Sequence, residues 1–204
     1  MALLLQHLNS TLRLIGEQPL LNSTSTLGDL CKQALDEALL TVVQETRHSS
    51  FSVLLSQTAT NADYLQPAFV LPSRVTQVDA IFYQAPNTTP TRLVKLKPGA
   101  LETLALNYRY CIIGNSVYVG NIIARPAQLR LKCWQAPSLP TNDGDTLVID
   151  SDVVPAFEAV AAATLATSYL DDLSQASTLA KRAQELVARL RLRAGATRDT
   201  IRYR

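Results

Sequence analysis

The sequence is short of the residues that most often carry chemistry. Among its 204 residues are two histidines, His7 and His48, and seven glycines. Hydrolases and transferases need a nucleophile beside a base that titrates near neutral pH, and this base is usually a histidine. His7 falls on the polar face of a predicted helix and His48 in a polar stretch, so we expect both to be solvated or hydrogen-bonded. The chain is therefore predicted not to be an enzyme.

Glycine and cysteine are too sparse for the common cofactor and metal motifs. No phosphate-binding loop, Gly-x-Gly-x-x-Gly or Gly-x-Ser-x-Gly motif occurs. The three cysteines are odd in number and widely spaced, which indicates reduced thiols and neither a disulfide framework nor a zinc site. The pairs Asp143 with Asp145 and Asp150 with Asp152 match no calcium loop, and we interpret them as a turn and a helix cap. No cofactor and no metal is expected.

Charge is also scarce. Charged residues make up 18% of the chain, below the roughly 25% that is typical of soluble domains. Because charge is depleted at the centres of interfaces, this shortage indicates surfaces that pack against other subunits. The N-terminal stretch does not resemble a signal peptide, and the apolar runs are shorter than the 18 or so residues of a membrane span. We expect an oligomer with no membrane segment.

Positive charge gathers towards the C-terminus. Residues 181–204 contain eight Lys and Arg against two acids, whereas residues 1–180 contain 11 Lys and Arg against 15 acids and have a net charge of −4. Three interpretations stay open: a solvated helix end, an arm that contacts nucleic-acid phosphates, and an arm that docks on a protein. We favour protein docking, because the arginine fork pairs well with carboxylates. The candidate docking residues are Arg189, Arg191, Arg193, Arg198, Arg202, Tyr203 and Arg204.

Apolar periodicity predicts two helical hairpins with β-structure between them. Apolar residues recur every three or four positions in residues 1–16, 27–47, 155–170 and 173–194, which is typical of helices. Between residues 49 and 150, short runs rich in Val, Ile, Tyr and Leu alternate with Pro and Gly, which indicates strands. Strands are predicted at Val75–Tyr83, at Leu93–Leu96 and around Leu129–Trp134, with a hairpin of Cys111–Ile113 and Val117–Val119.

These elements predict an α+β fold in four parts. Residues 1–48 form an N-terminal helical hairpin, residues 49–150 an inserted antiparallel β-module, and residues 151–194 a C-terminal hairpin that completes a four-helix bundle. After Ala194 and Gly195 the helical period is lost, so residues 195–204 are predicted to form an extended basic tail.

The order of motifs resembles a known family. The opening from Leu5 to Leu20, which ends in Leu-Ile-Gly-Glu-Gln-Pro-Leu, is similar to the start of the tail tubular protein A family, the head-to-tail adaptors of short-tailed phages. A segment at Phe69–Pro72 that leads into a strand, a hairpin at Tyr108–Val119 and two closing alanine-rich helices follow in the family's order. Two positions differ, because Ser49-Ser50-Phe51 stands where the family often has Trp-x-Phe and Leu71-Pro72-Ser73-Arg74 where it often has Leu-Pro-x-Asp.

The resemblance implies a virion structural protein. Adaptors of this family form a ring, usually of twelve copies, below the portal, connect it to the tail or nozzle protein and continue the DNA channel. The resemblance also implies that the C-terminal segment grips the portal, which assigns the arginine-rich end to docking. DNA is then expected to pass without specific binding, and the protein to reside in the virion neck after assembly in the host cytoplasm. The alternative function is a nucleic-acid-binding protein that uses the basic arm.

Overall fold

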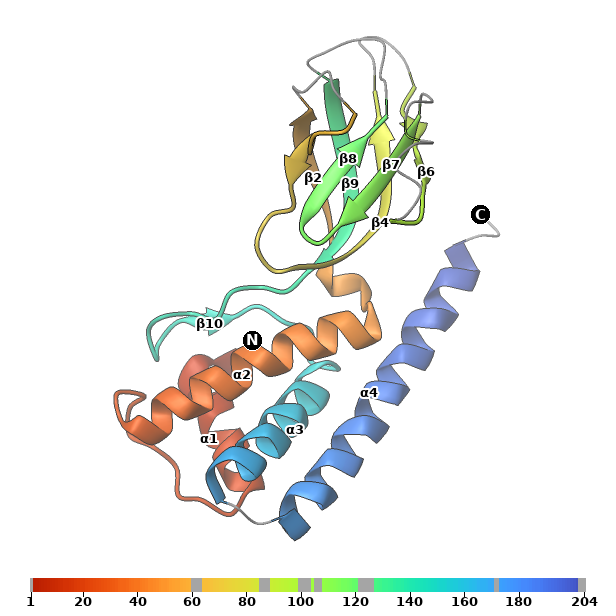
Figure 1. Ribbon diagram of the computed structural model, residues 1–204. Helices are drawn as coiled ribbons and strands as arrows, with labels where there is room; N and C mark the ends of the chain where they lie inside the picture. Colours follow the sequence, from red (N-terminus) through yellow and green to blue (C-terminus); the bar gives the residue numbers. More distant parts are fainter. Residues whose placement is uncertain are drawn as a thin grey trace. The chain divides into compact units, whose positions relative to one another are not determined.

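The computed structural model describes residues 2–59, 64–84, 89–98, 104, 108–120, 127–170 and 173–201. The chain divides into two compact units (Figure 1). Residues 1–51 and 136–204 form the helical unit, and residues 52–135 form the β unit. Within the described part of the chain, none of the helices combines the length and the apolar character that crossing a bilayer requires.

The helical unit consists of four α-helices and a two-stranded ribbon. Its helices are α1 (Leu4–Leu14), α2 (Thr26–Thr46), a short 3₁₀ helix (Ser49–Phe51), α3 (Val154–Leu165), a π-helical turn (Ala166–Leu170) and α4 (Leu173–Ile201). Its ribbon pairs β1 (Ala2–Leu3) with β10 (Thr146–Leu147) in antiparallel orientation.

Helix α3 is the centre of the helical unit. It packs against α1, α2 and α4. Six of its 12 residues are buried, namely Ala156, Phe157, Ala159, Ala161, Ala162 and Leu165. A helix that is apolar on nearly all sides is stable only when other elements surround it. The small alanine side chains let those neighbouring helices approach closely.

The predicted four-helix bundle with an inserted antiparallel β-module is wrong. A four-helix bundle packs four nearly antiparallel helices around a shared core. Here α1 has 11 residues and α4 has 29. The main partners of both helices are α2 and α3, so the helices gather around α3 rather than around a common axis. The apolar periodicity predicts two equivalent helical hairpins. In the structure α3 is apolar on nearly all sides, so α1, α2 and α4 all pack against it.

The predicted extended tail is also wrong as far as residue 201. Helix α4 continues without interruption to Ile201. Gly195 lies inside it, and a glycine in a helix interior costs only about 1 kcal/mol relative to alanine. That cost is too small to end a helix of 29 residues, so Gly195 does not terminate α4. Residues 202–204 lie outside the described residues.

The β unit contains two four-stranded sheets. One has the order β2-β9-β4-β5 and the other β3-β8-β7-β6. The strands of the first are β2 (Ser52–Ala59), β9 (Ala127–Gln135), β4 (Val75–Tyr83) and β5 (Thr91–Arg92). Those of the second are β3 (Phe69–Val70), β8 (Ser116–Val119), β7 (Arg109–Ile113) and β6 (Val94–Lys95).

The two sheets share one apolar core, to which β9 contributes most clearly. Along β9 buried and exposed side chains alternate, with Leu129 and Leu131 fully buried and Arg130 and Lys132 exposed, which confirms the predicted half-buried strand. The strand at 75–83 and the hairpin are confirmed by β4 and by β7 with β8. The module is not wholly antiparallel, however, because β6 pairs with β7 in parallel.

The start of α2 depends on a glycine. A Cβ atom at Gly28 would lie 2.5 Å from the carbonyl oxygen of Ser23, whereas one at Gly144 would have nothing within 4 Å. We predict that Gly28→Ala lowers the free energy of unfolding by about 1–3 kcal/mol, because the loop must move to relieve the clash. Gly144→Ala should change it by less than about 0.5 kcal/mol. Chemical denaturation measures both, and equal effects would contradict the prediction.

Candidate interaction surface

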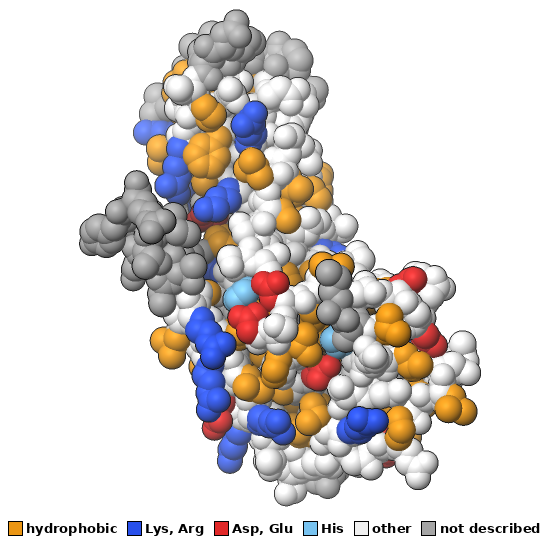
Figure 2. All heavy atoms as spheres, turned by 180° about the vertical axis from the view of Figure 1, so that it is seen from behind, with side chains coloured by type: hydrophobic (Ala, Val, Ile, Leu, Met, Phe, Trp, Pro, Cys, Tyr) orange, Lys and Arg blue, Asp and Glu red, His pale blue; other side chains and the backbone are white. Residues whose placement is uncertain are grey.

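Helix α4 places the candidate docking arginines on two different faces. Arg189 and Arg193 are one turn apart and share a face, with Arg182 two turns before Arg189. Arg191 lies two residues from each, which turns it roughly 200° away around the helix. Arg182, Arg189 and Arg193 are all exposed, and together we call them the basic stripe. In the rear view of Figure 2, Lys and Arg side chains are spaced along one edge of the helical unit.

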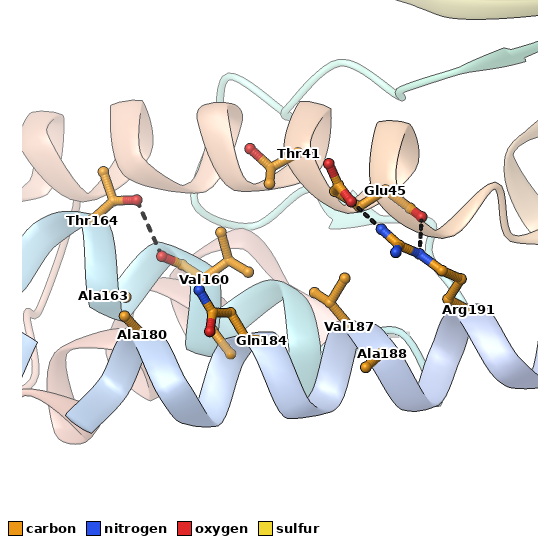
Figure 3. Close-up of a pocket in the computed structure, with 11 residues that line it drawn as sticks. Thr41, Glu45, Val160, Ala163, Thr164, Ala180, Gln184, Val187, Ala188 and Arg191 are labelled. Atoms are coloured by element: carbon orange, nitrogen blue, oxygen red, sulfur yellow. Dashed lines mark hydrogen bonds and ion pairs between the residues drawn. The ribbon is translucent and has the colours of Figure 1, made fainter. Parts of the chain in front are cut away.

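Arg191 faces α2 instead. Its Nε donates a hydrogen bond to the carbonyl oxygen of Glu45 at 2.9 Å, and its guanidinium also pairs with the Glu45 carboxylate (Figure 3). Both side chains are about half exposed, and ion pairs of this kind contribute about 1 kcal/mol or less. Within the chain, Arg191 therefore fastens α4 to α2 and is not part of the basic stripe.

The remaining candidate docking residues lie at or beyond the end of α4. Arg198 belongs to the helix, but its side chain is not among those described. Arg202, Tyr203 and Arg204 lie outside the described residues. Leu192 is the residue that sequence reasoning missed. It is 75% exposed next to Arg193, nine residues before the end of α4, so an apolar side chain lies beside the basic stripe.

A groove runs between α2, α3 and α4 (Figure 3). Its volume is about 530 Å³. It is lined by Thr41, Glu45, Val160, Ala163, Thr164, Ala180, Ala183, Gln184, Val187, Ala188 and Arg191. Ala163 and Ala180 lie together at one end, and the pair of Glu45 with Arg191 closes the other. The wall between is mostly methyl groups, which favours the binding of apolar side chains over polar ligands.

The loop between α1 and α2 presents a leucine to solvent. Leu21 is 96% exposed. On one side of it, the N–H of Leu20 donates to Asn9 Oδ1 at 2.7 Å, and Asn9 Nδ2 donates to the carbonyl oxygen of Leu20 at 3.1 Å. On the other side, the N–H of Ser23 donates to Asp143 Oδ2 at 2.8 Å. The backbone is thus fixed on both sides of an exposed apolar side chain.

His7 is part of the core. It is 1% exposed, its Nδ1 lies 2.8 Å from Glu158 Oε1, and its ring packs edge-on against Phe157. The expectation that His7 lies on a polar face is wrong, because α3 packs on that side of α1. The expectation of a hydrogen bond is confirmed. The pair of His7 with Glu158 therefore joins α1 to α3.

His48 lies between two aspartates. Its Nδ1 is 2.8 Å from Ser50 Oγ and 3.9 Å from Asp150 Oδ2, and its Nε2 is 3.3 Å from Asp152 Oδ2. The predicted helix cap is wrong, since the N-cap of α3 is Val153 and has no side-chain cap bond. One ligand atom from each of the three residues lies within 4.8 Å of the others. Ser50 Oγ is within hydrogen-bonding distance of Nδ1 and Asp152 Oδ2 of Nε2, whereas Asp150 Oδ2 is too far away, so the contacts are those of a hydrogen-bonded imidazole.

The cysteines are buried and chemically quiet. Cys31, Cys111 and Cys133 are not joined in disulfides. Burial raises the pKa of Cys31 and of Cys133 to about 11 and also raises that of Cys111. Because the thiolate is the reactive form, thiols with such pKa values are poor nucleophiles at neutral pH.

Compared with known proteins, the sequence matches no protein-family model and no curated protein. Its function is therefore argued from three features of the helical unit: the basic stripe, the groove between α2, α3 and α4, and the exposed Leu21.

Glu158 is expected to matter for stability. Glu158→Ala removes the partner of the buried His7 Nδ1, and a buried polar group without a partner costs about 1–3 kcal/mol. We predict a loss of free energy of unfolding in that range. Glu185→Ala, at an exposed position on α4, should change it by less than about 0.5 kcal/mol. A Glu158→Ala variant as stable as Glu185→Ala in urea would show that the pair is not structural.

Asp143 should make stability depend on pH. Its pKa is lowered by the side-chain hydrogen bond with Ser23 and then by the Ser23 N–H. These bonds therefore stabilise the fold above the unfolded-state pKa of about 3.9, and the stabilisation is lost as the pH falls through the lower folded-state pKa.

We predict that Asp143→Asn is less stable than wild type at pH 7 and that the difference narrows as the medium becomes acidic. Unfolding free energies measured at a series of pH values test this. Asp145→Asn, at an exposed position in the same turn, serves as the control. A difference between wild type and Asp143→Asn that stays constant with pH would contradict the prediction.

Proposed function

We propose that this protein is a virion structural protein, a head-to-tail adaptor that forms a ring below the portal of a short-tailed phage. In this role it connects the portal to the tail or nozzle and continues the DNA channel. The motifs from Leu5 onwards favour this family. The single observation that carries the proposal is that α4 exposes Leu192 beside the basic stripe of Arg182, Arg189 and Arg193.

The packing of α4 supports a docking role. Its buried residues are Ala176, Leu179, Ala183 and Leu190. Around Leu190, the side chains of Arg189, Leu192 and Arg193 are exposed on the described part of the helix. An amphipathic helix with one apolar anchor and a row of cations fits a groove with acidic edges on a partner.

Leu192 and the basic stripe provide the two parts of such an interface. A buried aliphatic or aromatic anchor supplies most of the binding energy in typical interfaces. Charges at the rim supply orientation and a faster association rate. Leu192, with Arg189 and Arg193 close to it on α4, meets both requirements. The partner is proposed to be the portal ring, through a surface rich in Asp and Glu.

The charge of the remaining chain is compatible with a DNA channel. Residues 1–180 have a net charge of −4, so a ring of such subunits repels the phosphate backbone instead of holding it. Strong phosphate contacts make binding tight and steeply dependent on salt, which would hinder passage of the genome. The excess of basic over acidic residues lies in residues 181–204, most of which belong to the helix that we assign to the portal.

The test reverses the charge of the basic stripe. We predict that the triple variant Arg182→Glu, Arg189→Glu and Arg193→Glu weakens binding to the portal ring of the same phage by about tenfold or more, equivalent to 1.4 kcal/mol. Mass photometry or sedimentation of mixtures with the portal ring measures this. The control variant carries the same change in net charge at exposed positions elsewhere, with Arg13, Lys97 and Arg130 replaced by Glu, and should bind normally.

Two results would overturn the proposal. One is a wild-type protein that does not bind the portal ring at all. The other is a wild-type protein that shifts duplex DNA with a steep salt dependence that truncation at Gly195 abolishes, which would establish the nucleic-acid-binding alternative. Equal loss of portal binding in the stripe variant and the control would show that only the overall charge matters.

A further inference from the structure

Two features of the helical unit are complementary to each other. One is the apolar groove between α2, α3 and α4, and the other is Leu21 in the loop between α1 and α2. We propose that the groove binds the α1–α2 loop of a second copy of this chain, with Leu21 as the anchor. The inference rests on the proposed function, because it names the contact that joins neighbouring subunits of the ring.

The loop has the properties of a preformed anchor. Hydrogen bonds of Asn9 with Leu20 and of Asp143 with Ser23 hold its backbone before any partner binds. An anchor that is already ordered loses less conformational entropy on binding, so more of its interaction energy appears as affinity. Leaving Leu21 96% exposed forfeits the 1.5–3 kcal/mol or so that burying a leucine side chain yields.

The charges of the two surfaces match. Residues 18–26 of the loop contain no charged residue. Glu45 and Arg191 are the charged members of the groove lining, and they neutralise each other as a pair. Neither surface therefore has to bury an unpaired charge when they meet, which would carry a large desolvation penalty. This is the charge pattern of interface centres, from which charge is depleted.

The positions of the two surfaces exclude insertion of Leu21 into the groove of its own chain. The loop precedes the first turn of α2, whereas the groove is lined by Thr41 and Glu45 near the other end of that helix. In Figure 1 the α1–α2 loop enters one end of α2, and the groove residues Thr41 and Glu45 belong to the part of α2 near its other end. A contact between two different patches of identical chains is heterologous, and repetition of such a contact closes into a ring when the rotation allows it.

Engineered cysteines test this contact directly. The native cysteines are all buried, so a disulfide formed under mild oxidation reports on the introduced thiols. Asn22→Cys and Ala188→Cys keep Leu21 in place and put one thiol at an exposed position on the loop and one at an exposed position in the groove. We predict that a mixture of the two single variants forms a covalent dimer, and that the double variant forms a ladder of dimers, trimers and larger oligomers. Each single variant alone should form none of these products in excess of an exposed control, Thr24→Cys.

Leu21→Ser gives an independent measurement. Because Leu21 is almost fully exposed, its replacement should leave the free energy of unfolding of the protein unchanged. Self-association, measured by sedimentation of the wild-type chain and the variant with and without the portal ring, should weaken by about tenfold or more if Leu21 is the anchor. Thr24→Ser, in the same loop and also exposed, should behave as wild type.

The outcomes separate this inference from the proposed function. Portal binding without the crosslink, while Asn22→Cys reacts readily with a maleimide, overturns the inference and leaves the adaptor proposal standing. The crosslinked ladder without portal binding supports the contact between copies and overturns the adaptor proposal. Leu21→Ser with unchanged self-association overturns the inference, whatever the portal does.

Discussion

The helical unit depends on the burial of one short helix. Helix α3 is apolar on nearly all sides, and α1, α2 and α4 must cover it to remove it from water. Alanines at its surface bring those helices close, and the same small side chains leave the space between α3 and α4 incompletely filled. The groove is thus a consequence of how the core is built. A larger residue at Ala163 would close the groove that the contact between copies requires.

The α1–α2 loop and the exposed face of α4, to which we assign functions, each present an apolar side chain on a backbone that the fold holds in place. Leu21 is held by hydrogen bonds of the loop backbone, and Leu192 is carried by a helix anchored through Leu190. Neither side chain contributes to the core of its own chain. Exposed apolar side chains are unfavourable in water for an isolated subunit, and their burial becomes favourable in an assembly. The small share of charged residues, 18% of the chain, agrees with the proposal that these positions are covered in an assembly.

The sequence predicted local structure better than arrangement. A run rich in Val, Ile and Tyr located β4, alternation of apolar and polar residues located β9, and apolar residues every three or four positions located the four helices, because these signals depend only on near neighbours. The packing of α3, the parallel pairing of β6 and the burial of His7 depend on residues far away in the chain, so periodicity did not show them. Gly195 illustrates the opposite error, since a local stop signal was given more weight than the stability of the whole helix.

The sequence predicted the basic character of the candidate docking surface but not the positions of its residues in space. The basic end was evident from composition, but only the helical phase of α4 separates Arg191, which pairs with Glu45, from Arg189 and Arg193. The groove combines α2 with α3 and α4, which are more than a hundred residues apart in the chain. For Leu21 a signal did exist, namely an apolar residue within a polar loop next to Pro19. Only the structure shows the hydrogen bonds of Asn9 and Asp143 that hold the loop backbone on both sides of Leu21.

The β unit begins and ends on neighbouring strands, so its two connections to the helical unit start close together. Ser52 at the start of β2 is the register partner of Trp134 near the end of β9. Paired residues in an antiparallel ladder are about 5 Å apart, so the chain leaves and re-enters the helical unit through two points with an almost constant separation. Strands and turns inside the β unit can therefore be lengthened, shortened or replaced by a different domain without changing the distance between the two points at which the β unit joins the helical unit. Exchange of this whole segment would change the surface of the β unit and leave the helical unit as it is.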